Sequence, residues 1–165
     1  GAQRYDTVYN ALKAAQELAI DTAPKEVLIY IHDGARPCIS QEIIKNCEEA
    51  ALRYGACTAA VPVKDTIKVV SPEGFAVDTP DRNTLWQIQT PQCFEYDLLA
   101  QSYDKLFSDM SCGKSVPAIT DDAMIVEYGS DTKVKLIEGS YENIKVTTPE
   151  DMGIAELFLK KRRKM

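Results

Sequence analysis

Residues 58–92, TAAVPVKDTIKVVSPEGFAVDTPDRNTLWQIQTPQ, alternate strand-like apolar runs with short charged segments. Two β-prone segments, Ile67–Val70 and Phe75–Asp78, flank the sequence Ser71-Pro72-Glu73-Gly74. Proline presets the backbone angle φ and glycine accepts a positive φ, so these four residues are typical of a tight turn. We therefore predict a β-hairpin that protrudes from the domain as an arm, at about residues 63–86.

The rest of the chain alternates helix and strand. Asp6 or Thr7 is suited to cap a first helix, Ser40 a second, and Thr120 another that runs to about Tyr128. The first helix would bury Val8, Leu12, Ala15 and Ala19, and the second would bury Ile43, Ile44, Cys47 and Ala51. The remaining elements are strands at Val27–Ile31, Thr58–Val63, Leu85–Gln89 and Val134–Ile137, and helices at about Tyr96–Phe107 and from Thr148-Pro149 onward.

This order predicts one domain over residues 1–165. We expect an α/β fold with a doubly wound, mostly parallel, Rossmann-like sheet of the nucleotidyltransferase type that carries the arm.

Charge and composition exclude several classes of protein. Nineteen basic and 25 acidic residues give a net charge of −6, whereas nucleic acids and anionic membranes require a basic face. No apolar run approaches the ~20 residues of a membrane-spanning helix. The five cysteines are odd in number and lack C-x-x-C spacing, which favours a reduced, cytoplasmic protein over a disulfide framework or a zinc site. We expect neither a nucleic-acid nor a membrane partner.

Polar residues follow the predicted strands, where α/β sheets bind their ligands. Asp33 can orient a hydroxyl, Gly34 lets a ligand approach the backbone, and Arg36 can bind a phosphate. A tight turn with an internal Asp–Arg pair explains the same residues, so both interpretations stay open. Thr66 and Arg82 lie near the two roots of the predicted arm, where a hydroxyl and a guanidinium can meet an anionic ligand.

Three further features have a structural alternative. Lys145 points away from its apolar neighbours in an extended segment, as a solvated lysine also does. His32, the one histidine of the sequence, is interpreted as a packed, hydrogen-bonded residue rather than a general base. Asp121 and Asp122 are interpreted as the charged start of a helix and not as metal ligands.

Together with Val27–Pro37, VLIYIHDGARP, and Glu138–Asp151, EGSYENIKVTTPED, residues 58–92 resemble one family closely. It is the family of 2-C-methyl-D-erythritol 4-phosphate cytidylyltransferases, and the resemblance runs from Gly1 to Glu156. In that family a glycine-rich nucleotide loop with an arginine and a lysine precedes the segment that matches residue 1. The resemblance therefore implies that the domain is N-terminally incomplete and that this chain alone is inactive.

The resemblance implies the transfer of CMP from CTP to 2-C-methyl-D-erythritol 4-phosphate, with release of pyrophosphate, in non-mevalonate isoprenoid biosynthesis. Mg²⁺, bound mainly through the CTP phosphates, is the implied cofactor. A homodimer formed through the arm is the implied assembly. Thr66 and Arg82 would then enter the neighbouring subunit's site, while Lys145 and Asp33 would act in their own.

The resemblance also assigns site residues. Arg82 and Lys145 are implied as catalytic residues. The implied substrate-binding residues are Asp33, Arg36, Thr66, Thr90 and Thr120, and the implied nucleotide-binding residues are Gly1, Ala2, Thr7 and Gly34. No protein side chain is implied as a metal ligand.

Two alternatives remain. A ribitol 5-phosphate cytidylyltransferase would have the same fold and chemistry with a different polyol phosphate. A chain without the nucleotide loop could also be a non-catalytic binding or assembly fragment. Turnover with each acceptor separates these hypotheses.

Overall fold

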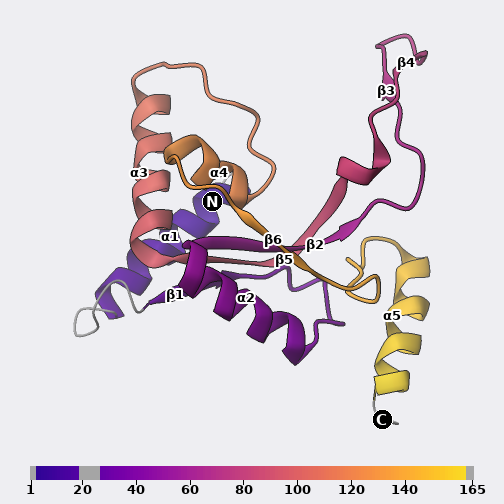
Figure 1. Ribbon diagram of the computed structural model, residues 1–165. Helices are drawn as coiled ribbons and strands as arrows, with labels where there is room; N and C mark the ends of the chain where they lie inside the picture. The colour runs from indigo at the N-terminus through magenta and orange to yellow at the C-terminus, as the bar shows by residue number, and fades with distance from the viewer. Residues whose placement is uncertain (1–2, 19–26, 163–165) are drawn as a thin grey trace.

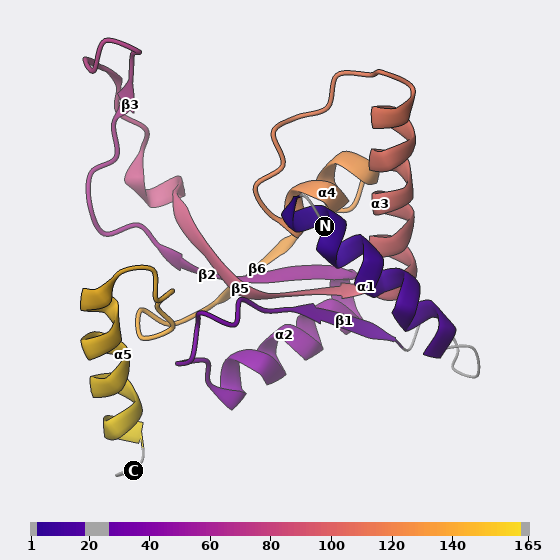
Figure 2. The same ribbon diagram turned by 180° about the vertical axis from the view of Figure 1, so that it is seen from behind.

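The structure, a computed structural model, describes residues 3–18 and 27–162 and contains a four-stranded sheet with helices on both faces (Figure 1). The strands lie in the order β1 (Leu28–Ile31), β5 (Trp86–Glu95), β2 (Ala56–Pro62) and β6 (Lys135–Glu138). One face is covered by α2 (Gln41–Tyr54), and the other by α1 (Arg4–Leu18), α3 (Tyr96–Ser111) and α4 (Asp122–Gly129), as Figures 1 and 2 show. Helix α5 (Pro149–Arg162) lies beyond the end of the sheet from which the arm leaves.

The prediction of a mostly parallel sheet is wrong, because β5 runs opposite to both of its neighbours. Strands β1 and β2 each pair with β5 in antiparallel register, and β2 pairs with β6 in parallel. Continuous burial along β2 is typical of a parallel sheet. Here the helices on the two faces bury β2 and the second half of antiparallel β5 alike, so burial does not report strand direction.

The pairing still gives three strands one common direction. Since β1 and β2 both oppose β5, they run the same way as each other, and β6 runs parallel to β2. The carboxyl ends of β1, β2 and β6 therefore meet at one edge of the sheet, beside the N-terminal half of β5. This is the edge at which the loops that follow the strands bring polar residues together.

Helix α2 forms as the sequence predicts. The Oγ atom of Ser40 accepts a hydrogen bond from the backbone N–H of Ile43, and Gly55, with a φ of 79°, ends the helix. Cys47 and Ala51 are buried against the sheet with Ile43. Ile44, predicted to share this stripe, is 39% exposed, because it lies at the edge of the buried face.

The other face of the sheet is covered by an aromatic cluster. Leu12 of α1 is buried, and Tyr9 stacks on Phe107 of α3 with ring centroids 4.4 Å apart. Val8 and Ala15 pack partly buried against the same core. Ala19, the last residue predicted on this stripe, lies outside the described residues.

Two predicted helix starts are displaced. Helix α1 begins at Arg4, so Asp6 lies in its first turn and accepts a hydrogen bond from the N–H of Gln3 instead of capping the helix. Helix α4 is capped by Asp121, whose Oδ1 accepts from the N–H of Met124. Thr120 lies one residue too early to reach that N–H group. Its hydroxyl contacts the Met124 sulfur instead.

The arm is the predicted hairpin. Its strands β3 (Val69–Val70) and β4 (Ala76–Asp78) pair in antiparallel register, and Gly74 takes the positive φ of 87° that the turn requires. It projects well beyond the sheet (Figure 1). The apolar side chains Ile67, Val69, Val70, Phe75 and Val77 are 39% to 72% exposed. Within the described residues, no helix has the length and apolar character needed to span a bilayer.

Candidate functional site

A polar cavity of about 270 Å³ opens at the edge where β1, β2 and β6 end. Its lining comes from the loop after β1, the middle of β5, the start of α4, the segment after β6 and the start of α1. The structure brings together five residues predicted from sequence: Asp33, Arg36, Thr90, Thr120 and Lys145. It adds residues that the sequence did not indicate: Arg4, Ile88, Gln89, Gln92 and Asp121.

Asp33, Arg36 and Lys145 form one charged group at this cavity. The Asp33 Oδ2 atom lies 3.1 Å from Lys145 Nζ and 3.3 Å from Arg36 Nε. Burial alone raises the pKa of the Asp33 carboxyl, but its hydrogen bonds and charge interactions with Lys145 and Arg36 outweigh burial and hold that pKa below its usual value. The lysine side chain stays 49% exposed, so its ammonium group remains accessible to a ligand.

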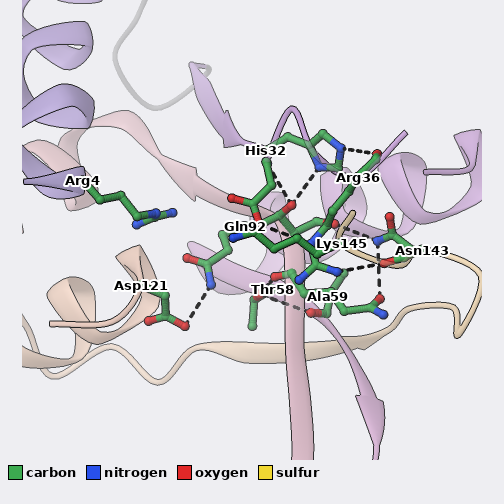
Figure 3. Close-up of polar contacts among 12 residues, drawn as sticks. Arg4, His32, Arg36, Thr58, Ala59, Gln92, Asp121, Asn143 and Lys145 are labelled. Atoms are coloured by element: carbon green, nitrogen blue, oxygen red, sulfur yellow. Dashed lines mark hydrogen bonds and ion pairs between the residues drawn. The ribbon is translucent and has the colours of Figure 1, made fainter. Parts of the chain in front are cut away.

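Asn143 holds this group in place from behind the cavity. It is fully buried, and its backbone carbonyl accepts a hydrogen bond of 2.8 Å from Arg36 Nη1. Its Nδ2 atom donates to the backbone carbonyl of Thr90 at 2.9 Å. Asn143 therefore links the loop after β1, strand β5 and the segment that carries Lys145 (Figure 3). Apart from its position two residues before Lys145, no feature of the sequence indicated this role for Asn143.

His32 lies beside the cavity and contacts two residues of its wall. Its Nδ1 atom is 3.0 Å from Thr90 Oγ1, and its Nε2 atom is 3.1 Å from the backbone oxygen of Arg36. The predicted hydrogen bonds are therefore present, whereas the predicted burial is not, because His32 follows the last residue of β1 and is exposed. Figure 3 shows His32 on the same side of the site as Arg36 and Lys145.

The two aspartates at the start of α4 have separate partners. Asp121 caps the helix and accepts a hydrogen bond from Gln92 Nε2 at 3.0 Å. Asp122 is fully buried, where it pairs with Arg4 and accepts from the Tyr103 hydroxyl at 2.6 Å. The interpretation of these acids as helix-start residues agrees with the contacts. Arg4 in turn lines the cavity opposite Arg36 and Lys145 (Figure 3), which places three cations around it.

Comparison with known proteins agrees with this arrangement. The family model described as 2-C-methyl-D-erythritol 4-phosphate cytidylyltransferase, IspD, matches residues 1–161. The chain belongs to the IspD family. It is 48% identical over 160 residues to the enzyme of that name from Lachnospira eligens, and 48% identical over 164 residues to that from Alkaliphilus oremlandii. These matches cover 97% and 99% of this chain but 65% and 63% of the relatives, so the chain spans somewhat less than two thirds of their length.

Solved structures of the family share the fold. The enzyme from Francisella tularensis matches with a TM-score of 0.79 and 31% identity, over 96% of this chain and 69% of that one. The enzyme from Thermus thermophilus matches with a TM-score of 0.77 and 30% identity, over 97% of this chain and 70% of that one. The mixed sheet and the protruding hairpin are therefore features of the IspD fold in this chain.

In this IspD-family chain the two predicted arm residues lie away from the cavity lining. Arg82 is exposed in a short 3₁₀ turn at Arg82–Thr84, and its Nη1 atom donates to the backbone oxygen of Lys64 at 2.9 Å. Thr66 is exposed at the other root of the arm. Neither residue contributes to the cavity wall.

Thr7 and Gly34, two of the residues predicted to bind the nucleotide, are not part of the cavity lining. Thr7 lines an apolar groove of about 330 Å³ between α1 and β1, which His32 also borders. Gly34 is exposed, and a Cβ atom at this position would meet nothing within 4 Å, so the space in front of it is open to a ligand. Gly1 and Ala2 lie outside the described residues.

Proposed function

We propose that this chain is the acceptor-binding part of a cytidylyltransferase that transfers CMP from CTP to 2-C-methyl-D-erythritol 4-phosphate, in non-mevalonate isoprenoid biosynthesis. One observation carries the proposal. Asp33 and Arg36, on the loop after β1, converge with Lys145 from a distant part of the sequence at one cavity in a chain of the IspD family. Cations at an accessible cavity suit a phosphorylated acceptor.

The proposed reaction requires two anions to meet. A phosphate oxygen of the acceptor forms a bond to the α-phosphorus of CTP, and the bond from that phosphorus to the β-phosphate oxygen breaks, which releases pyrophosphate. The acceptor phosphate is already anionic near neutral pH, so little deprotonation is needed. Catalysis then consists mainly of positioning and of charge neutralisation. In this chain Lys145 and Arg36 would hold the acceptor phosphate, and Arg4 would add positive charge on the opposite side.

Asp33 would position the Lys145 ammonium group to bind the acceptor phosphate. The carboxylate holds the ammonium group 3.1 Å away and at the mouth of the cavity, where the other faces of the ammonium stay free to bind oxygen. Thr90 and Thr120 would contribute hydroxyl groups to the acceptor. Thr7 and Gly34, together with Gly1 and Ala2, would lie on the cytidine side.

Magnesium would enter this site with the triphosphate. Among residues 3–18 and 27–162, no group of three or more His, Cys, Asp or Glu side chains comes together as a metal cage. Asp33 is engaged by two cations and Asp121 by the α4 backbone and Gln92, so the donor set fits an anion better than a bare cation. Mg²⁺ commonly binds through substrate phosphates with few protein ligands, and it supplies neutralisation of their charge.

The arm supports a homodimer. Its apolar side chains are exposed, and a two-stranded hairpin is only marginally stable when nothing covers it. We propose that each arm packs on a second copy and brings Thr66 and Arg82 to the neighbour's cavity, since both lie away from the cavity of their own subunit. The cysteines Cys38, Cys47, Cys57, Cys93 and Cys112 are all free thiols, which fits the proposed cytoplasmic location.

The test of this function uses a completed enzyme, defined as this chain joined to the part of the Lachnospira eligens relative that lies outside the match. We expect it to release pyrophosphate from CTP and Mg²⁺ when 2-C-methyl-D-erythritol 4-phosphate is added. The chain by itself should not, because it spans less than two thirds of the length of these relatives. Higher kcat/KM with ribitol 5-phosphate would assign the other acceptor. No turnover with either acceptor, while the relative itself is active, would contradict the proposal.

A further inference from the structure

A chain of three hydrogen bonds joins His32 to the wall of the cavity. The backbone N–H of Asp33 donates to Thr90 Oγ1 at 3.0 Å, and the same oxygen lies 3.0 Å from His32 Nδ1. The other ring nitrogen, Nε2, lies 3.1 Å from the backbone oxygen of Arg36. Thr90 lines the cavity, whereas His32 borders the apolar groove on its other side. The hydroxyl of Thr90 therefore connects the histidine ring to the cavity.

The chemistry of these groups fixes the direction of every hydrogen bond. A backbone carbonyl only accepts, so His32 Nε2 must carry a hydrogen and donate it to Arg36. A neutral imidazole has one such hydrogen, so Nδ1 must accept, and the Thr90 hydroxyl must be its donor. The backbone N–H of Asp33 only donates, so it occupies one of the two lone pairs of Thr90 Oγ1. With neutral His32, the Thr90 hydroxyl hydrogen therefore points away from the cavity.

Protonation of the ring reverses one of these bonds. Both ring nitrogens of a histidinium donate, so Nδ1 would donate to Thr90 Oγ1. That oxygen would then accept from both His32 and Asp33, and its own hydrogen must turn elsewhere. We propose that His32 is a positioning residue that sets the direction of the Thr90 hydroxyl, which donates to His32 when the ring is neutral and donates into the cavity, to an oxygen of a bound phosphate-like anion, when the ring is protonated.

The groups around His32 and Thr90 come from several elements. The charged groups at the cavity are Asp33 and Arg36 on the same loop as His32, Lys145 from the segment after β6, Arg4 from α1 and Asp121 at the start of α4, whose oxygens already accept from Gln92 and the Met124 N–H. On the groove side, the lining residues from α1 do not titrate, and burial raises the pKa of Tyr30, which keeps its phenol neutral. Three of the five charged groups are cations, and each of the two carboxylates already has its own partners. A bound anion would offset the cations and provide the acceptor that the turned hydroxyl needs.

The direction of the hydrogen bonds follows from the geometry alone. The role of the Thr90 hydroxyl in binding the acceptor rests on the proposed function. The first experiment therefore needs no substrate. Because the chain has one histidine, an ¹⁵N-labelled sample gives a single imidazole, whose two nitrogens are distinguished by long-range ¹H–¹⁵N spectra. At a pH where the ring is neutral, we expect the hydrogen on Nε2. A ring that carries it on Nδ1 would overturn the proposal.

The second experiment measures the coupling with sulfate, which keeps its double charge throughout the pH range of a histidine titration. We expect sulfate to raise the midpoint of the His32 titration by about 0.5–1 pH unit, because the anion accepts the hydrogen that only the protonated state directs into the cavity. Thr90→Ser keeps the hydroxyl and should show the same rise. Thr90→Val has similar shape without the hydroxyl and should show less than half of it.

The results for the two Thr90 variants distinguish coupling through the Thr90 hydroxyl from simple charge attraction between sulfate and His32. If the midpoint rises equally in Thr90→Val, sulfate acts on His32 through charge alone, and the proposed coupling through the Thr90 hydroxyl is wrong. The coupling is also wrong if the midpoint rises neither in the unmodified chain nor in Thr90→Ser. Neither experiment uses CTP or a polyol phosphate. If the coupling between His32 and the Thr90 hydroxyl is absent, the proposed reaction is not contradicted. If the proposed reaction is not observed, the coupling is not contradicted.

Discussion

Replacing Lys145 by alanine in the completed enzyme should remove the most accessible cation of the Asp33 group. A charge-assisted hydrogen bond to a phosphate is worth ~1.5–3 kcal/mol, so kcat/KM for the acceptor should fall about 10- to 150-fold. The effect on folding should be much smaller, under ~1 kcal/mol, because the Lys145 side chain is 49% exposed and its ion pair with Asp33 is screened by water. Activity should therefore fall without a matching fall in stability.

The assay follows pyrophosphate release with the acceptor varied at saturating CTP, and binding of CTP alone is measured in parallel. Lys161→Ala is the matched control, since that lysine also forms an exposed ion pair, 2.9 Å from Glu142, but lies on α5 outside the cavity lining. We expect the control to keep full activity and Lys145→Ala to keep its CTP affinity. Equal damage to CTP binding would place Lys145 on the nucleotide side, and a large drop in melting temperature would assign it a structural role.

Asp33→Asn should lower the melting temperature near pH 7, and this difference should shrink as pH falls below the usual aspartate pKa of about 4, because the native Asp33 pKa is held below that value and the stability gained is lost as pH falls through the native pKa; a difference in thermal unfolding that does not shrink in acid would contradict this. Asp122→Ala should lower the free energy of unfolding in urea by ~1–3 kcal/mol, because it leaves the buried Tyr103 hydroxyl without its acceptor, and Tyr103→Phe should recover part of that loss. Phe75→Ser should raise the dimer dissociation constant of the completed enzyme about 10-fold or more in sedimentation experiments, whereas the same change at Leu52 on α2, which is 59% exposed against 72% for Phe75, should not; equal effects would place the interface elsewhere.

The sequence predicted local structure well wherever the signal was local. The turn at Ser71–Gly74, the cap at Ser40 and the start of α5 at Pro149 each depend on a few neighbouring residues, and each is present in the structure. The direction of β5 was not predictable in this way, because it depends on which strands it joins. Its second half was also missed, since Pro91 interrupts the pattern of a strand although the strand continues to Glu95.

In the candidate site too, residues marked by a local pattern were predicted, and residues that depend on distant contacts were not. Asp33 and Arg36 follow a predicted strand, so position in the sequence was enough to nominate them. Arg4 and Asn143 were missed because their roles exist only through distant contacts, with Asp122 in one case and with Arg36 and Thr90 in the other. Asn143 lies well after the end of β6 and not beside a strand end, and no local pattern distinguishes either Asn143 or Arg4 from a solvated polar residue.

Mixing two strongly impaired variants of the completed enzyme tests the central claim most directly, namely that the cavity of one subunit works with the arm of the other. Arg82→Ala and Lys145→Ala enzymes are mixed and allowed to exchange subunits. In a mixed dimer one site draws Lys145 from the first variant and Arg82 from the second, while the other site lacks both. Random exchange makes about half of the dimers mixed, each with one intact site, so activity should return to roughly a quarter of the unmodified enzyme. If no activity returns although exchange is confirmed, Arg82 acts in its own subunit and the account is wrong.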